Sequence, residues 1–220
     1  MTKKKGFMRK PILLFLAILF AFPCLAFAGI DTDLRIKLGS VAGADRIVFI
    51  NAVGHGSNNN GTNAQVEVVL SPQRDRAVGF IMAISAFHRQ HEGQTHDLSL
   101  PIKVDYAVTG MSIAPGVRLR ISDTWNFEGK LELGAGNAGN VTVNSPGVIW
   151  NATKTGSYES ASLIAGWYYL FKSAASRVGL EVGGQTFKGN FEIWSNHGYW
   201  TDGHVTGTGG TVNIVYGIQF

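Results

Sequence analysis

The sequence predicts an all-β protein, an eight-stranded antiparallel up-and-down transmembrane β-barrel. Three observations lead to this prediction. The chain of 220 residues begins with an export signal, continues with eight segments in which apolar and polar residues alternate, and ends on an aromatic residue, Phe220. Alternation with a period of two is typical of strands that turn one face to an apolar environment.

The first 28 residues have the pattern of a cleaved signal peptide. Basic residues stand near the start, an uncharged apolar run follows, and Ala26-Phe27-Ala28 matches an A-x-A cleavage site. We therefore expect residues 1–28 to be removed and residues 29–220 to form one barrel domain. A membrane helix is the alternative, but Pro23 interrupts a run that is barely long enough to span a bilayer.

Removal of the signal changes the charge balance. The full chain has a formal net charge of +4, whereas residues 29–220 hold 14 basic and 15 acidic residues, a net charge of −1. The basic excess belongs to the signal, so we expect no nucleic-acid partner. Cys24 is the only cysteine in the sequence and leaves with the signal. This excludes disulfides and cysteine-based metal sites from the mature chain, and we expect no cofactor.

Eight segments alternate apolar and polar residues and predict the strands. They cover residues 34–39, 64–70, 78–86, 113–121, 127–135, 160–169, 177–183 and 211–220. The last is the clearest, because Val212, Ile214, Tyr216, Ile218 and Phe220 share one face. Ten strands remain an alternative to eight.

The predicted connections alternate between long and short. Short ones lie near residues 71–75, 123–126 and 172–176, and long ones near residues 41–63, 87–111, 136–157 and 188–210. This is the plan of an outer-membrane barrel with tight periplasmic turns, long outer loops and both termini on the periplasmic side. Residues 101–107 could instead extend a strand above the membrane.

The polar faces of the strands predict a charged lumen. Apolar side chains then face lipid, and the polar face fills the interior with residues that can pair across strands. A soluble lipocalin-like barrel is the alternative, in which the same apolar faces would pack a core. The predicted lumen network consists of Arg118, Arg120, Glu128, Lys130, Glu132, Arg177 and Glu181. Aromatic residues near the periplasmic rim suit an interfacial girdle.

The signal peptide, the eight alternating strands and the ending Tyr216-x-Ile218-x-Phe220 together resemble the small bacterial outer-membrane barrels of the OmpA/OmpX type. The resemblance covers nearly all of residues 29–220 and implies a location in the outer membrane of a Gram-negative bacterium. It also implies that the barrel-assembly machinery reads the last strand, with Tyr216, Ile218 and Phe220 as the assembly signal.

The six histidines all fall in the predicted outer loops. His88, His91 and His96 are spaced closely enough to share a metal ion if their loop folds back. Histidine is also common in surface loops, and no carboxylate or cysteine stands at a matching spacing, so we expect no metal site.

Residues 191–196 faintly resemble the Ser-Asn stretch of the outer-membrane lipid A deacylases, which hydrolyse an acyl ester. Those enzymes have a histidine two residues before the serine, whereas Ile193 stands before Ser195 here. A serine needs an adjacent base to act as a nucleophile. The hydrolase is therefore an alternative with an incomplete motif, and no catalytic residue is assigned.

An eight-stranded barrel has an interior that side chains can fill, so a wide pore is not expected. The leading hypothesis is a role in envelope integrity or surface interaction through the outer loops. Trp194, Tyr199 and Trp200 in the last loop suit contact with lipopolysaccharide or a partner. The expected partners of the barrel are outer-membrane lipid and lipopolysaccharide. A narrow pore or a lipid A hydrolase remains an alternative, and the sequence names no extracellular ligand.

Overall fold

The computed structural model describes residues 30–49, 52–72, 76–95, 102–145, 148–152, 156–195 and 200–220. Almost all of these residues lie in β-strands, which confirms the all-β prediction. The strands are β1 (Asp31–Phe49), β2 (Ala52–Ser71), β3 (Val78–Thr95), β4 (Ile102–Arg120), β5 (Trp125–Ser145), β6 (Val148–Ala152), β7 (Gly156–Phe171), β8 (Ser176–Ser195) and β9 (Trp200–Gln219). A single turn of 3-10 helix, Lys172–Ala174, joins β7 to β8. Within the described ranges, no helix has the length and apolar character needed to cross a bilayer.

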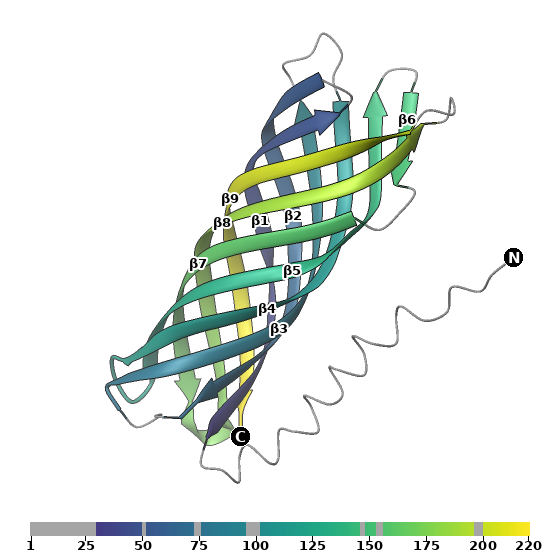
Figure 1. The fold of residues 1–220 in the computed structure, drawn as a ribbon. Coiled ribbons are helices and arrows are strands. Elements are labelled where there is room, and N and C mark those ends of the chain that lie inside the picture. The colour runs from purple at the N-terminus through teal and green to yellow at the C-terminus, as the bar shows by residue number, and fades with distance from the viewer. Residues whose placement is uncertain are drawn as a thin grey trace, which may run out of the picture.

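Eight long strands close into an antiparallel barrel (Figure 1). The ring runs β1-β2-β3-β4-β5-β7-β8-β9, and the pairing of β1 with β9 closes it. That closing pair runs from Asp33 opposite Gln219 to Phe49 opposite Gly203. Closure leaves no long strand with an open edge, which is what a sheet in lipid requires. The predicted eight-stranded up-and-down barrel is confirmed.

The short strand β6 prolongs the wall above β7. Because β7 begins at Gly156, opposite Ala138 of β5, the wall beyond that level needs another partner for β5 and β8. β6 supplies it, with Trp150 paired to Val143 of β5 and to Ser195 of β8. The sequence placed this segment in a loop.

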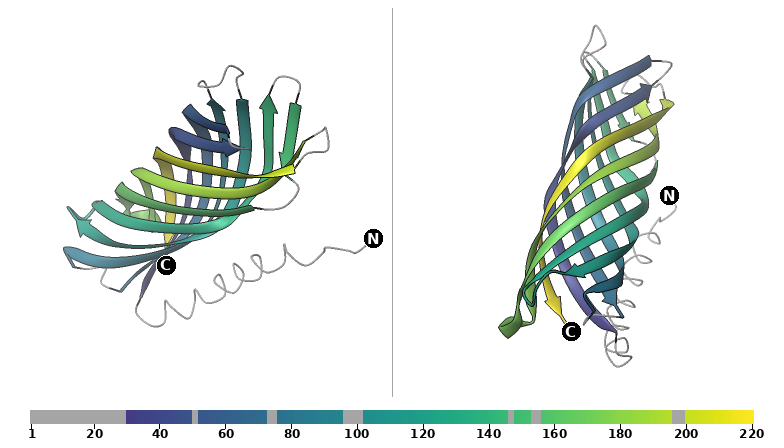
Figure 2. Two further views of the ribbon diagram at one scale, coloured as in Figure 1. Left: turned by 45° about the horizontal axis from the view of Figure 1, so that its top comes forward. Right: turned by 90° about the vertical axis from the view of Figure 1, so that its left-hand side faces the viewer.

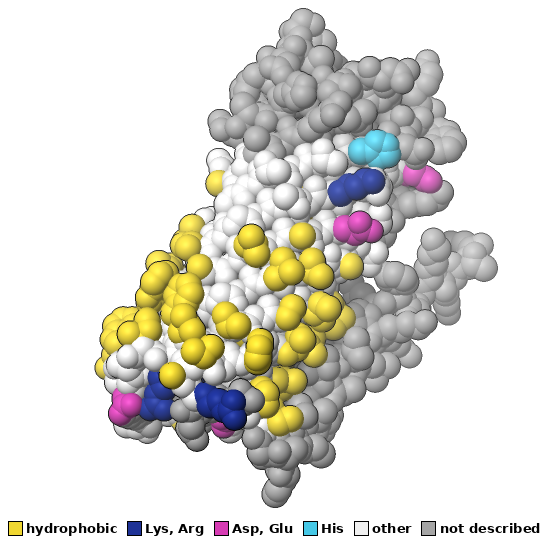
Figure 3. Space-filling model, turned by 60° about the vertical axis from the view of Figure 1, so that its left-hand side comes forward, with side chains coloured by type: hydrophobic (Ala, Val, Ile, Leu, Met, Phe, Trp, Pro, Cys, Tyr) yellow, Lys and Arg dark blue, Asp and Glu magenta, His cyan; other side chains and the backbone are white. Residues whose placement is uncertain are grey.

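The outer surface carries an apolar belt near the end of the barrel where β1 begins and β9 ends, here called the terminal end. Figure 3 shows hydrophobic side chains gathered over this part of the wall. The most exposed of them are Phe80 71%, Leu163 69%, Ile214 67%, Ile121 62% and Leu38 61%. A soluble protein would bury such side chains, so the belt marks the part of the wall that faces lipid.

The strands are much longer than the belt. The long strands have 16 to 21 residues, whereas a tilted strand crosses a bilayer in about 9–11. The far half of the wall, here called the distal extension, bears polar outward side chains such as Thr62, His88, Glu159, Lys188 and Thr206. The predicted long loops are therefore wrong over most of their length, because they are paired strand, and the extension of a strand through residues 102–107 is confirmed. Figure 2 shows the elongated barrel and its tilted strands from two further directions.

Local contacts fix the terminal end. The Phe220 backbone N–H donates to the carbonyl of Thr32 at 2.9 Å and so ties the last residue to β1. In the β4–β5 turn, Ser122 Oγ accepts from the backbone N–H of Thr124 at 3.2 Å and of Trp125 at 3.1 Å. Side-chain hydroxyls of this kind stabilise tight turns.

Aromatic rings lie over inward-facing glycines at two places. A Cβ on Gly179 would lie 2.3 Å from Cδ1 of Tyr168, and a Cβ on Gly110 would lie 2.7 Å from Cζ of Phe87. The missing side chains thus make room for large rings inside a narrow barrel. These two rings close the lumen at different heights.

Candidate functional site in the barrel lumen

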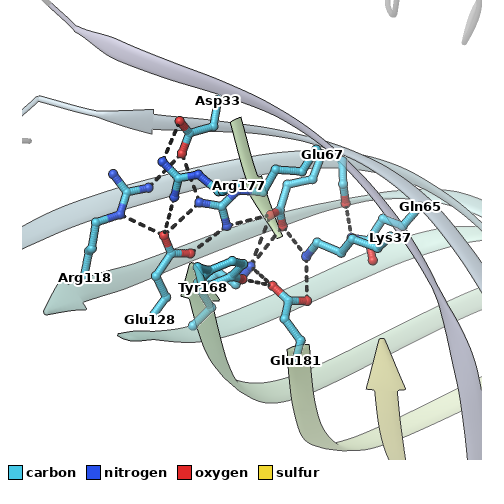
Figure 4. A network of polar contacts seen from close by, with 12 residues as sticks. Asp33, Lys37, Gln65, Glu67, Arg118, Glu128, Tyr168, Arg177 and Glu181 are labelled. Carbon is cyan, nitrogen blue, oxygen red and sulfur yellow. Dashed lines mark hydrogen bonds and ion pairs between the residues drawn. The ribbon is translucent and has the colours of Figure 1, made fainter. Parts of the chain in front are cut away.

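Charged side chains fill the lumen, and Figure 4 shows the contacts between them. They lie at the level of the apolar belt, because they alternate along the strands with its exposed residues. They come from five of the eight long strands and are almost completely buried. Two groups can be distinguished along the barrel axis. The arginine layer, nearer the terminal end, consists of Asp33, Arg35, Arg118, Glu128 and Arg177. The lysine layer above it consists of Lys37, Glu67, Lys130 and Glu181.

In the arginine layer, two carboxylates gather three guanidinium groups. Glu128 receives both terminal nitrogens of Arg35 at 2.7 Å and Nε of Arg118 at 2.8 Å. Asp33 contacts Arg35 at 3.0 Å, and Arg118 and Arg177 at 2.9 Å each. Two-pronged arginine–carboxylate contacts are among the strongest and most directional in proteins.

In the lysine layer, each ammonium group lies between two glutamates. Lys37 Nζ lies 2.6 Å from Glu67 and 2.9 Å from Glu181, and Lys130 Nζ lies 3.2 Å from Glu67 and 2.5 Å from Glu181. The hydroxyl of Tyr168 donates to Glu181. Arg35 Nη1, 3.5 Å from Glu67, connects this layer to the arginine layer.

A third polar group sits where the belt gives way to the distal extension. Arg89 Nη2 contacts Glu132 at 2.8 Å, and Gln65 Nε2 donates to the same carboxylate at 2.8 Å. Asn63 donates to Asn213 at 2.9 Å across the neighbouring part of the lumen. With these contacts, side chains from all eight long strands meet inside the barrel.

The distal extension has an aromatic core instead of a charged one. His91 stacks on Tyr106 with ring centroids 4.7 Å apart and lies 5.3 Å from the ring of Phe187. Tyr158 stacks on Phe187 at 5.9 Å. With an apolar interior and a polar exterior, this half of the barrel is built like a soluble one. Burial lowers the pKa of His91 to about 4, with a further contribution from the positive charge of Arg89, so the ring is neutral at pH 7.

Six of the seven side chains of the predicted lumen network lie buried in ion pairs within the lumen: Arg118, Glu128, Lys130, Glu132, Arg177 and Glu181. Arg120 does not join them, and that part of the prediction is wrong. It is the last residue of β4, its side chain is 37% exposed at the terminal rim, and it pairs with Asp123 at 2.7 Å.

Several members of the network were absent from the predicted set. The alternation places Arg35, Lys37 and Glu67 on the polar faces that line the lumen, but the predicted network leaves them out. Asp33 precedes the first predicted strand, and Arg89 lies in a predicted loop, so periodicity gave no signal for either. Tyr168 is on the lumen face of its strand, but only the pairing register shows that it reaches Glu181.

The proposed assembly residues lie side by side on the outer face of the last strand. Tyr216 is 50% exposed, Ile218 40% and Phe220 60%. All three belong to the apolar belt. Their role as an assembly signal stays a prediction.

The histidines do not follow the predicted loop arrangement. His88 faces outward and contacts Thr109 at 3.0 Å, whereas His91 faces the lumen, so the two cannot share one ion. His55 and His204 also lie in strands, while His96 and His197 lie outside the described residues. In the part of the chain that the structure describes, no three His, Cys, Asp or Glu side chains are grouped to hold a metal.

The remaining hydrolase candidate is at the distal tip. Ser195 is the last residue of β8 and its backbone pairs with Trp150. The neighbouring tryptophans Trp194 and Trp200 are paired across β8 and β9, and Tyr199 is outside the described residues. The side chains at this tip are likewise outside the described part, and the hydrolase stays a prediction.

Among the comparisons with known proteins, one solved structure supports the fold. No protein-family model matches the chain, and no curated protein sequence matches it. The outer membrane protein OprG of Pseudomonas aeruginosa superposes with a TM-score of 0.50 at 12% identity, covering 86% of this chain and 95% of that one. The outer membrane protease OmpT of Escherichia coli has a TM-score of 0.44 at 10% identity, covering 86% and 97%. Ail, the attachment invasion locus protein of Yersinia pestis, has a TM-score of 0.36 at 18% identity, covering 86% and 98%.

At these identities the likeness concerns the fold alone. The apolar belt, the closed ring of eight long strands and the charged lumen agree with it. The chain has the fold of the small outer-membrane β-barrels.

Proposed function

We propose that the protein is a closed outer-membrane barrel that serves in envelope integrity or surface interaction, and that it does not conduct solutes. In this proposal residues 1–28 are a cleaved export signal. The terminal end faces the periplasm, and the distal extension projects outside the cell. The barrel-assembly machinery reads Tyr216, Ile218 and Phe220, and the outer wall contacts membrane lipid and lipopolysaccharide.

The observation that carries the proposal is the contact between Arg35 and Glu128. Their strands, β1 and β5, are four positions apart in the ring of eight, so they lie on opposite sides of the lumen. Both N–O distances are 2.7 Å, and the pair therefore crosses the full width of the interior. The lysine layer and the Arg89–Glu132 pair add further obstructions above it. A solute would have to break several buried ion pairs to pass.

The distal extension supports a role in contact with partners. Strands that continue past the belt hold the hairpin tips away from the membrane on a paired, aromatic-cored wall. A rigid scaffold of this kind is suited to presenting variable tips for binding.

The proposal is tested by shortening the β8–β9 hairpin between Gly189 and Thr206 to a tight turn. The barrel below would remain, because the belt and both charged layers lie outside this segment. We expect normal amounts of folded protein in the membrane. We also expect weaker binding to vesicles containing lipopolysaccharide, or greater entry of detergent into cells.

The matched control is Arg120→Gln, which changes an exposed ion pair at the opposite end of the barrel. Its binding and detergent sensitivity should equal those of the unmodified protein. If the shortened hairpin leaves both measurements unchanged, the last hairpin has no part in the function.

A further inference from the structure

The buried charges of the lumen are balanced in two places and unbalanced in a third. In the lysine layer two lysines meet two glutamates, and above it Arg89 meets Glu132. The arginine layer holds three guanidinium groups but only two carboxylates. Among the described side chains buried in that layer, one positive charge is therefore in excess.

The hydrogen bonds of the arginine layer show where the excess lies. Arg177 donates from Nη2 to Asp33 at 2.9 Å, but its Nε and Nη1 have no hydrogen-bond partner, and Nη1 is 3.5 Å from Glu128. Arg35 Nε also lacks a partner. Both side chains have a relative exposure of 0%. A buried cation with unused donors is strongly destabilising unless an acceptor reaches it.

We propose that the arginine layer binds one small oxyanion of the phosphate class. Guanidinium groups offer paired N–H donors in a plane, and these match two oxygens of a phosphate better than they match a single-atom ion. One such anion would offset the excess charge and accept the unused donors of Arg177.

The arginine layer is the charged layer nearest to the terminal end, which faces the periplasm in the function proposed above. Arg118, Asn126 and Ser176, which lie close to the terminal ends of their strands, keep relative exposures of 5%, 6% and 7%. A free phosphate ion and the phosphate of a lipid headgroup have the same chemistry. They differ in whether the bound group is tethered to the membrane.

The test uses residues 29–220 refolded in a zwitterionic detergent. Unfolding by urea is followed by tryptophan fluorescence as inorganic phosphate replaces chloride at constant ionic strength. We expect saturable stabilisation, with the unfolding equilibrium constant falling about 100-fold when phosphate reaches 100 times its Kd. Equilibrium dialysis with labelled phosphate should give one ion per barrel.

Two variants remove the excess charge. Arg177→Met and Arg118→Gln should each abolish the phosphate dependence and the dialysis signal, and either one suffices if the other does not fold. The matched control, Arg89→Met, removes a lumen arginine from a balanced pair. It should unfold at lower urea than the unmodified barrel but keep the full response to phosphate.

The same titration in bicelles distinguishes the two sources. If a lipid headgroup occupies the layer, bicelles with phosphatidylglycerol should stabilise the barrel through Arg177, and added phosphate should have little further effect. Stability that is equal in phosphate and chloride, together with no bound phosphate in micelles and no Arg177-dependent lipid effect, would overturn the proposal.

Discussion

Arg35 and Glu128 meet across the full width of the barrel, from strands on opposite sides of the ring, with two N–O distances of 2.7 Å. The pair belongs to a layer in which every charged side chain contacts at least one of opposite charge. Removing one partner leaves the others buried and uncompensated. The ion pairs of the lumen therefore connect distant strands, and the loss of one side chain weakens the contacts of several others.

The first prediction concerns this pair. Glu128→Gln should reduce the free energy of unfolding by about 3–5 kcal/mol, because Arg35 and Arg118 lose a buried counter-charge. Urea unfolding of the refolded barrel measures the change. Arg120→Gln is the comparison at the exposed rim, and a loss within about 0.5 kcal/mol is expected there. An equal loss of unfolding free energy in the two variants would mean that the arginine layer does not stabilise the barrel.

The second prediction concerns the packing of Tyr168 over Gly179. A Cβ on residue 179 would lie 2.3 Å from the Tyr168 ring and 2.6 Å from the carbonyl oxygen of Trp167, so Gly179→Ala must displace the ring or the strand. We expect a loss of about 1–3 kcal/mol in unfolding free energy. Gly184→Ala is the matched control, because a Cβ there meets nothing within 4 Å. The control should unfold at the same urea concentration as the unmodified barrel.

The third prediction is a pH dependence from the distal extension. The pKa of His91 is about 4 in the folded protein and near 6.5 when unfolded, so the unfolded chain binds the proton first as the pH falls. The free energy of unfolding should have its full value above pH 6.5. It should fall by as much as about 3 kcal/mol as the pH drops towards 4. His91→Phe should remove this part of the pH dependence. Identical pH profiles for the two proteins would show that His91 is not buried as a neutral ring.

The fourth prediction separates assembly from stability. Phe220→Ala changes a 60%-exposed side chain on the outer face of the barrel. In cells we expect less barrel in the outer membrane and more unfolded chain in the periplasm. Refolding of the purified variant into detergent should proceed as for the unmodified chain. Normal assembly in cells would remove Phe220 from the proposed signal.

The alternation of apolar and polar residues predicted the strands within the apolar belt. It did not predict them in the distal extension. In the belt, large apolar residues mark every second position, and all eight long strands were found there. In the distal extension the outward positions carry Thr, Asn, His or Glu and many inward ones carry Gly, so the same alternation looks like a loop. The limits of the strands and the short strand β6 were missed for this reason.

The sequence indicates which kinds of side chain line the lumen, but it does not indicate which of them form ion pairs with one another. Glu128 and Arg118 face each other across neighbouring strands, which a tight β4–β5 turn already implies. The contact from Arg35 to Glu128 depends on barrel closure and strand number, and no local pattern encodes it. Arg120 was misplaced because alternation gives the direction of a side chain but not the height at which the lumen opens to solvent.

The most direct test of the closed barrel is the conductance of residues 29–220 in a planar lipid bilayer. The proposed structure predicts no discrete current steps from the unmodified protein over hours of recording at moderate voltage. The double variant Arg35→Met/Glu128→Leu removes the contact across the lumen and serves as the comparison for a weakened plug. Frequent, long-lived unitary currents from the unmodified barrel, at a protein dose that gives verified insertion, would contradict the claim that its ion pairs close the lumen.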